Sequence, residues 1–177
     1  MGGCIGKRVV RAVVLMGLTS PFCVACTNSG PAMDVGNASG RGGDKVSVGA
    51  ALRGSGGTVV AASDEIVYDS TQVNVDLNAD GTPRCTIDAR IGVGSAADKT
   101  LLLSVTDVGA TQKKLTVGVI NLQNANAISD GALFACDFVI APGAHAGATV
   151  LQHTLGASDT QANEISIPGA TGTITVK

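Results

Sequence analysis

The stretch SDGALFACDFVIA, residues 129–141, decides the fold. From Phe134 to Ile140 every even-numbered residue is apolar, whereas Asp137, the one charge after the opening turn, occupies an odd position. Side chains along a strand point alternately to opposite faces, so this pattern predicts a strand with one continuous apolar face. A hydrophobic core must therefore cover that face.

The composition predicts an all-β domain. The chain of 177 residues is long enough for one domain with a sizeable core. Hydrophobic residues make up 45% of it, but aromatic residues make up only 2% and tryptophan is absent, so the core must consist of Val, Ile, Leu and Ala. The 24 glycines, many Thr and Val residues and the lack of a long helical pattern favour strands joined by turns.

Alternating apolar residues predict further strands on both sides of the central stretch. Turn residues separate them about every eight to twelve positions, a spacing typical of an antiparallel sandwich or jelly roll rather than a parallel sheet with crossover helices. Residues 124–128 are the one candidate for a short helical turn. The predicted strands are 46–52, 58–62, 65–68, 73–77, 85–91, 101–108, 115–120, 149–155, 164–167 and 171–176.

The first 26 residues predict an export signal. Basic residues between positions 7 and 11 precede an apolar run, 13–24, that is short for a membrane span. A small residue before Cys26 resembles a bacterial lipoprotein cleavage site, which implies a lipid-anchored Cys26 at the cell envelope. Ordinary cleavage after Ala25, giving a secreted protein, is the alternative. A buried N-terminal helix fits the sequence less well.

The segment after the signal predicts a linker. Residues 27–43 are rich in Gly, Ser and Asn and show no apolar alternation. Such a composition is typical of a flexible tether. The folded domain is therefore expected to begin at Asp44 and to span residues 44–177.

Charges are sparse and scattered along the chain. Charged residues make up 15% of it and the net charge is −2. No basic patch with interleaved aromatic residues is present in the sequence. Nucleic acid is therefore excluded as an expected partner.

Cys85 and Cys136 lie on the apolar faces of two predicted strands. In an exported protein, an even pair on inward faces is a disulfide candidate. Two buried free thiols are the alternative, because Cys also behaves as a small hydrophobic residue. No CxxC motif or His cluster lies near them, so a metal site is disfavoured.

The segment Asp76-x-Asn78-x-Asp80-Gly81 matches the first half of an EF-hand calcium loop, which needs oxygen ligands at alternate positions and Gly at the sixth. The twelfth position is Ile87, which cannot supply the closing carboxylate. A simple Asx and Gly turn is therefore favoured. Asp76, Asn78 and Asp80 remain calcium candidates, and no other cofactor is expected.

The two histidines do not indicate a catalytic site. His145 falls in a Gly- and Pro-containing loop and is expected to be solvated. His153 shares a strand face with Leu151 and Leu155, the pattern of a core or rim residue whose polar atoms are satisfied. No serine lies in a nucleophile elbow and no pair of carboxylates can be singled out. The chain is predicted not to be an enzyme.

The order and spacing of several segments resemble those of bacterial cohesin-like domains. The resemblance covers about residues 44–177 and implies an antiparallel β-sandwich with jelly-roll topology and about nine strands, related to carbohydrate-binding modules. In cellulosome scaffolds, cohesins bind dockerin modules and assemble polysaccharide-degrading enzymes. The segments are 64–73 (DEIVYDSTQV), 79–87 (ADGTPRCTI), 128–138 (ISDGALFACDF), 147–151 (GATVL) and 172–176 (GTITV).

Two functions follow from this resemblance. The first is a non-catalytic, exported interaction module that binds a dockerin-like or other exported protein. The alternative is a carbohydrate-binding module, which would need exposed aromatic rings, whereas Tyr68, Phe134 and Phe138 are all predicted to face inward. The exposure of Tyr68 distinguishes the two, because a buried ring favours the interaction module.

Overall fold

The computed structural model describes residues 30–169 and 171–177, and all regular elements there are strands. The predicted export signal, residues 1–26 with Cys26, lies outside the described residues. In the part that is described, no helix is apolar and long enough to cross a membrane. The strands are β1 Ala32–Val35, β2 Asn37–Gly40, β3 Lys45–Arg53, β4 Ala61–Asp69, β5 Val73–Val75, β6 Cys85–Ile87, β7 Thr100–Asp107, β8 Gln112–Ile120, β9 Gly131–Ile140, β10 Gly147–Ser158, β11 Glu164–Ile165 and β12 Gly172–Val176.

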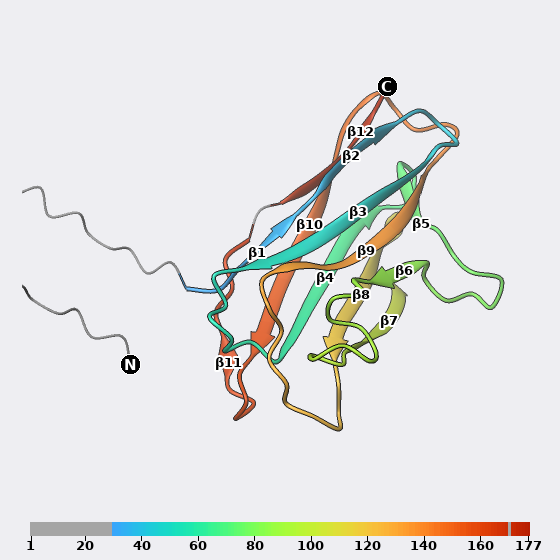
Figure 1. The fold of residues 1–177 in the computed structure, drawn as a ribbon. Coiled ribbons are helices and arrows are strands. Elements are labelled where there is room, and N and C mark those ends of the chain that lie inside the picture. Colours follow the sequence, from blue (N-terminus) through green and yellow to red (C-terminus); the bar gives the residue numbers. More distant parts are fainter. Residues whose placement is uncertain (1–29, 170) are drawn as a thin grey trace, which may run out of the picture.

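The strands form two sheets that pack face to face (Figure 1). The smaller sheet has the order β1-β3-β9-β5, and β6 also pairs with β9. The larger sheet has the order β2-β12-β10-β4-β8-β7, and β11 also pairs with β10. The predicted all-β sandwich is confirmed. The higher strand number arises because the chain adds short strands at the sheet edges, such as β2 and β11.

The core lies between the sheets, and β9 supplies much of it, as predicted. Phe134, Cys136, Phe138 and Ile140 are all at most 4% exposed. The ring of Phe138 meets that of Tyr68 from β4 edge to face, with centroids 5.7 Å apart. Such aromatic pairs add to the stability gained from burial alone. Other buried residues facing them from the larger sheet are Ile66, Leu115, Val117, Val119, Leu151 and Ile174.

A β-bulge modifies the alternation within β9. Ala50 pairs with Phe134 and the next residue, Ala51, pairs with Ala132, so Leu133 is the extra residue. A bulge of this kind lets two successive residues lie on the same side. Leu133 and Phe134 are accordingly both buried. The strict even-numbered pattern therefore holds from Phe134 onwards.

The prediction of a linker over residues 27–43 is wrong for residues 32–40, which contain strands β1 and β2. The folded domain therefore begins before Asp44. β1 pairs with β3 in the smaller sheet, and β2 pairs in parallel with β12 in the larger sheet. Met33 in β1 is fully buried. The chain passes from one sheet to the other at Gly36, where a Cβ would lie 3.3 Å from the carbonyl oxygen of Gly49. Glycine thus permits the crossing.

Smaller departures concern strand lengths. The predicted strand 65–68 and the last two residues of the predicted strand 58–62 form one strand, β4, whereas residues 58–60 are not in a strand. The predicted strand 85–91 ends at Ile87, because a turn follows in which the Ile91 N–H bonds to the Asp88 carbonyl. The predicted strand 73–77 ends at Val75, where the chain leaves the sheet, and Leu77 is 46% exposed. Residues 124–128 form no helix.

Candidate functional site

The outward side chains of β4, β7, β8 and β10 form a surface that is called the open face below. These four strands are neighbours in the larger sheet, and their registers align the outward residues in rows across it. Most of the outward residues are exposed or half-buried. Strand alternation separates this surface from the core side of the same strands.

One row of the open face contains a hollow. Ser63 in β4 pairs with Gly118 on one side and with Gly156 on the other, and Gly118 also pairs with Leu102 in β7. The two glycines present no side chains, which leaves a hollow of about 360 Å³ lined also by Ile120. Leu102 at its edge is 55% exposed. This hollow can receive an apolar side chain of a partner.

The middle of the open face is polar. The Lys114 ammonium lies 2.9 Å from the Glu65 carboxylate, and both side chains are partly exposed. Thr116 and Thr154 pair with Glu65 from the strands on either side. Hydroxyl groups can donate and accept hydrogen bonds, so this row suits a polar contact.

A second hollow lies at the other end of the open face. It measures about 440 Å³ and is lined by Gln112, Gln152 and the loop before β10. His145 in this loop is exposed, as predicted, and its backbone N–H donates to the Gln72 side chain at 2.9 Å. Val150 beside the hollow is 51% exposed. Apolar side chains are therefore accessible at both ends of the face.

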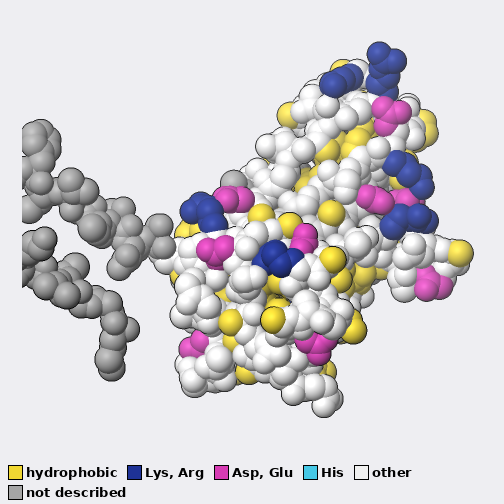
Figure 2. Space-filling model, in the orientation of Figure 1, with side chains coloured by type: hydrophobic (Ala, Val, Ile, Leu, Met, Phe, Trp, Pro, Cys, Tyr) yellow, Lys and Arg dark blue, Asp and Glu magenta, His cyan; other side chains and the backbone are white. Residues whose placement is uncertain are grey.

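The outer surface of the smaller sheet differs, because its charges pair with one another. Lys45 lies 2.7 Å and Arg84 3.1 Å from the Asp76 carboxylate. Arg53 pairs with Asp34 at 2.7 Å. Figure 2 shows such basic and acidic side chains in neighbouring groups. This surface is already internally neutralised.

The calcium candidates take part in this charge cluster and in a turn. The hydrogen bond from Lys45, with the charges of Lys45 and Arg84, lowers the pKa of Asp76. Asp80 accepts hydrogen bonds from the Thr82 hydroxyl and N–H, which lower its pKa, and Asn78 donates to the same hydroxyl. Within residues 30–169 and 171–177, no group of three or more His, Cys, Asp and Glu side chains is arranged to hold a metal.

The predicted disulfide is confirmed. Cys85 in β6 and Cys136 in β9 are directly opposite each other, with Cα atoms 4.0 Å apart, and their sulfurs are bonded. The bridge closes a segment with a sequence separation of 51. It fastens the short strand β6 to the central strand of the smaller sheet.

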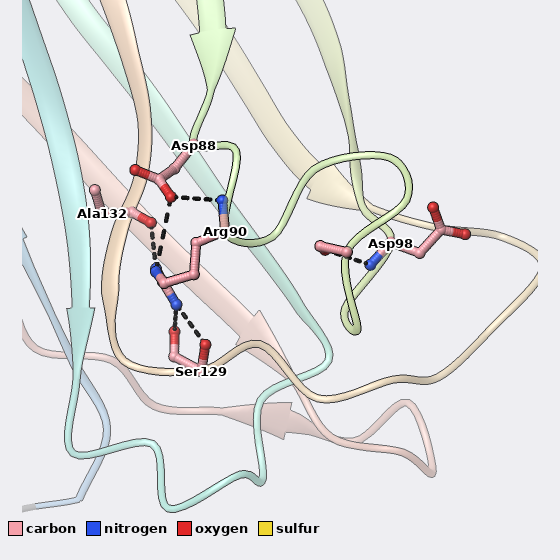
Figure 3. Close-up of polar contacts among 6 residues, drawn as sticks. Asp88, Arg90, Asp98, Ser129 and Ala132 are labelled. Atoms are coloured by element: carbon pink, nitrogen blue, oxygen red, sulfur yellow. Dashed lines mark hydrogen bonds and ion pairs between the residues drawn. The ribbon is translucent and has the colours of Figure 1, made fainter.

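Arg90 joins the loop after β6 to the start of β9 through several hydrogen bonds (Figure 3). This contact was not predicted from the sequence. The Arg90 guanidinium donates to the carbonyl oxygens of Ser129 and Ala132 and to the Ser129 hydroxyl. It also lies 3.7 Å from Asp88. Gly131 beneath it has φ 125°, and a Cβ there would lie 3.0 Å from the guanidinium. Glycine is needed at this position.

A buried carboxylate–imidazole pair joins β4 to β10 on the core side of the open face. His153 Nδ1 lies 2.8 Å from Asp64, and the two side chains are 3% and 0% exposed. His153 was predicted to be a core or rim residue with satisfied polar atoms. This holds for Nδ1, but Nε2 is buried without a hydrogen-bond partner among the described residues. Asp64 was missed, although it shares the parity of Ile66 and Tyr68, which signals an inward position.

Comparisons with known proteins give a match at the level of structure. No family model matches the sequence, and the search of curated proteins gives no significant match. The solution structure of CaCohA2 from Clostridium acetobutylicum is 23% identical, with a TM-score of 0.64, and the match covers 82% of this chain and 91% of that one.

Two further cohesins are similar. One is the third ScaC cohesin of Acetivibrio cellulolyticus, in complex with the ScaB dockerin: 21% identity, coverage of 82% and 98%, and a TM-score of 0.62. The other is a non-cellulosomal cohesin from the archaeon Archaeoglobus fulgidus: 14% identity, coverage of 84% and 92%, and a TM-score of 0.58. The sandwich is therefore a cohesin-like jelly roll, and the resemblance found in the sequence is confirmed for the fold.

Proposed function

We propose that this chain is an exported, non-catalytic interaction module that binds a dockerin-type protein through its open face. The observation that carries the proposal is the glycine hollow beside the exposed Leu102. Interfaces gain most of their affinity from a few side chains that fill such hollows, surrounded by polar contacts. Similar folds in solved structures, including the ScaC cohesin, are found in complex with dockerins.

The low charge of the open face also supports a protein partner. At its centre, the one cation–anion pair, Lys114 with Glu65, is already formed and partly exposed. A partner that covers it does not have to neutralise an isolated charge, which would be costly when desolvated. The threonine hydroxyls of the same row remain available as hydrogen-bond donors and acceptors.

The burial of Tyr68 favours a protein partner over a polysaccharide. Tyr68 is 2% exposed and Phe134 and Phe138 at most 4%, so none of the aromatic rings in the described range offers a stacking platform. This is the arrangement expected of the interaction module. Binding to a polysaccharide is the alternative, and the pull-down described below tests for it.

Export and anchoring belong to the same proposal. The Cys85–Cys136 disulfide supports export, because such bonds persist in oxidising compartments. A lipid anchor at Cys26 would hold the domain at the cell envelope, and cleavage without lipid would release it. Labelling with a radioactive fatty acid on expression in a bacterium distinguishes the two, with Cys26→Ala as the control.

A pull-down with the full-length chain tests the proposal. The bait is exposed to the organism's secreted and envelope proteins, with a polysaccharide panel alongside and calcium present or absent. We expect one protein to be retained by the wild type and by Ser47→Arg, which alters the outer surface of the smaller sheet, but not by Leu102→Arg. Retention of a polysaccharide without a protein, or equal retention by both variants, would contradict the proposal.

A further inference from the structure

Lys99 is fully buried in the connection between β6 and β7. Lysine is almost never fully buried unless it is paired. The backbone holds it firmly: its N–H bonds to the Ile91 carbonyl at 2.7 Å, and the preceding residue, Asp98, has φ 51°. A positive φ in a residue other than glycine costs energy and often marks a functional position.

The Lys99 side chain has one hydrogen-bond partner, the amide oxygen of Asn124, which lies 3.1 Å from Nζ. Among the described residues, no carboxylate forms an ion pair with it. A charged ammonium offers three donors, and a buried charge with two unused donors is costly. Burial lowers the pKa of Lys99, which favours the neutral amine. A neutral lysine amine is a nucleophile.

The Asn124 amide is arranged as the matching electrophile. Its Oδ1 accepts the contact from Lys99 and a second hydrogen bond, at 3.0 Å, from the backbone N–H of Asn126. Donors on a carbonyl oxygen draw electrons from its carbon and stabilise the negative charge that develops when a nucleophile attacks. The two residues come from loops that are 25 positions apart in sequence but are held together in the fold.

We propose that Lys99 and Asn124 form an intramolecular isopeptide bond. The Nζ lone pair attacks Cγ of Asn124, the Nζ–Cγ bond forms and the Cγ–Nδ2 bond breaks. One proton moves from Nζ to the departing nitrogen, which leaves as ammonia. No oxidant or reductant is consumed.

Asp98, which precedes Lys99, forms no ion pair with its amine and acts on it only through space. Its carboxylate is occupied by the Gly94 N–H at 3.0 Å and by the Asn121 amide at 3.3 Å, so the proton passes directly from Nζ to the departing nitrogen. The product replaces an under-partnered buried amine by a neutral amide.

Mass spectrometry of the full-length chain, after reduction of the disulfide, tests the proposal. Relative to Lys99→Arg and Asn124→Ala, and after correction for each substitution, the wild type should be lighter by the mass of one ammonia. A tryptic digest should contain a branched peptide that joins the segments around Lys99 and Asn124, with no cleavage after Lys99.

The wild-type digest is decisive even if a variant fails to fold. If the wild type has its full mass and trypsin cleaves normally after Lys99, the proposal is overturned. Lys99 and Asn124 would then be joined by a hydrogen bond alone. Loss of ammonia without a branched peptide would also overturn it, because it would show cyclisation of Asn124 onto its own backbone. Binding of the protein partner is not required for either readout.

Discussion

The two sheets are reinforced in different ways. The smaller sheet is fastened by the Cys85–Cys136 disulfide and carries paired charges, such as Lys45 with Asp76, on its outer surface. The larger sheet is joined on its core side by the buried pair of Asp64 and His153. Its outer surface is the open face, which has one central ion pair, Lys114 with Glu65, and accessible apolar side chains at both ends. Both reinforcements lie on the core side, so the sheets differ mainly in their outer surfaces.

This difference has a physical reason. Ion pairs on a surface contribute little to stability, but they occupy that surface and must be desolvated when it is covered. A buried, hydrogen-bonded pair places the polar contact out of the partner's reach.

The largest effect is expected from Asp64→Ala in the larger sheet. Removing the carboxylate leaves the His153 Nδ1 buried without its hydrogen-bond partner. Losing a buried hydrogen bond to a carboxylate costs about 3 kcal/mol, and the cavity left by the side chain adds to this loss. Asp107→Ala is the control, because its pair with Lys113 is exposed and 3.8 Å long, which is worth below about 1 kcal/mol. The free energies of unfolding from urea denaturation provide the comparison. Equal losses in both variants would show that the buried pair does not reinforce the sheet.

The next effect concerns the disulfide of the smaller sheet. Replacing Cys85 and Cys136 together by alanine opens the closed segment, and the unfolded chain gains entropy. The expected loss is about 2–4 kcal/mol. Thermal unfolding with and without reductant measures it: the wild type should melt lower in reductant, whereas the double variant should not respond. A wild type that is insensitive to complete reduction would contradict the prediction.

The sequence predicted those elements whose pattern is local. The alternation in β9 identified the central strand, and the inward positions of Cys85 and Cys136 identified the disulfide. β2 was missed because its partner is distant: Asn37 accepts hydrogen bonds from Thr173, which lies 136 positions away. β1 was missed although its partner, β3, is nearby in sequence. Both strands have only four residues, and β2 (NASG) contains Gly and Asn, so neither has a local pattern strong enough to distinguish it from a linker.

The open face could not be read from the sequence for a related reason. A single glycine in a strand, such as Gly118 or Gly156, indicates weak packing or a bulge. The hollow exists because the register places both glycines beside Ser63 and next to Leu102. Register between strands far apart in sequence depends on the whole sandwich, whereas the side of a strand on which a residue lies depends only on parity.

Filling the hollow should weaken partner binding without unfolding the domain. A Cβ on Gly118 would lie 3.5 Å from the Leu102 Cβ, an ordinary contact, so Gly118→Leu can be accommodated. Affinity for the protein retained in the pull-down should fall about 10- to 100-fold, the cost of losing one central contact. Titration calorimetry measures it, with Ser47→Leu on the smaller sheet as the control. Unchanged affinity would place the interface elsewhere.

The smallest effect is expected at the end of the smaller sheet, where Asp130 joins the turn after β3 to the turn before β9. Hydrogen bonds from Ser55 and from the Gly54 N–H lower the pKa of the Asp130 carboxyl. Its contribution is therefore present above the unfolded-state pKa and is lost as the pH falls through the lower folded-state value. Because Asp130 is exposed, the contribution should stay below about 1 kcal/mol.

Urea denaturation at a series of pH values tests this contact. At neutral pH, Asp130→Asn should be slightly less stable than the wild type, because a neutral amide oxygen accepts more weakly than a carboxylate. The difference should shrink below about pH 4, where carboxyl groups take up protons. A gap that stays constant down to low pH would show that the charge of Asp130 is not what joins the two turns. The link between the two turns would then depend on packing and not on the charge of the carboxylate. This contact would no longer distinguish the smaller sheet from the larger one.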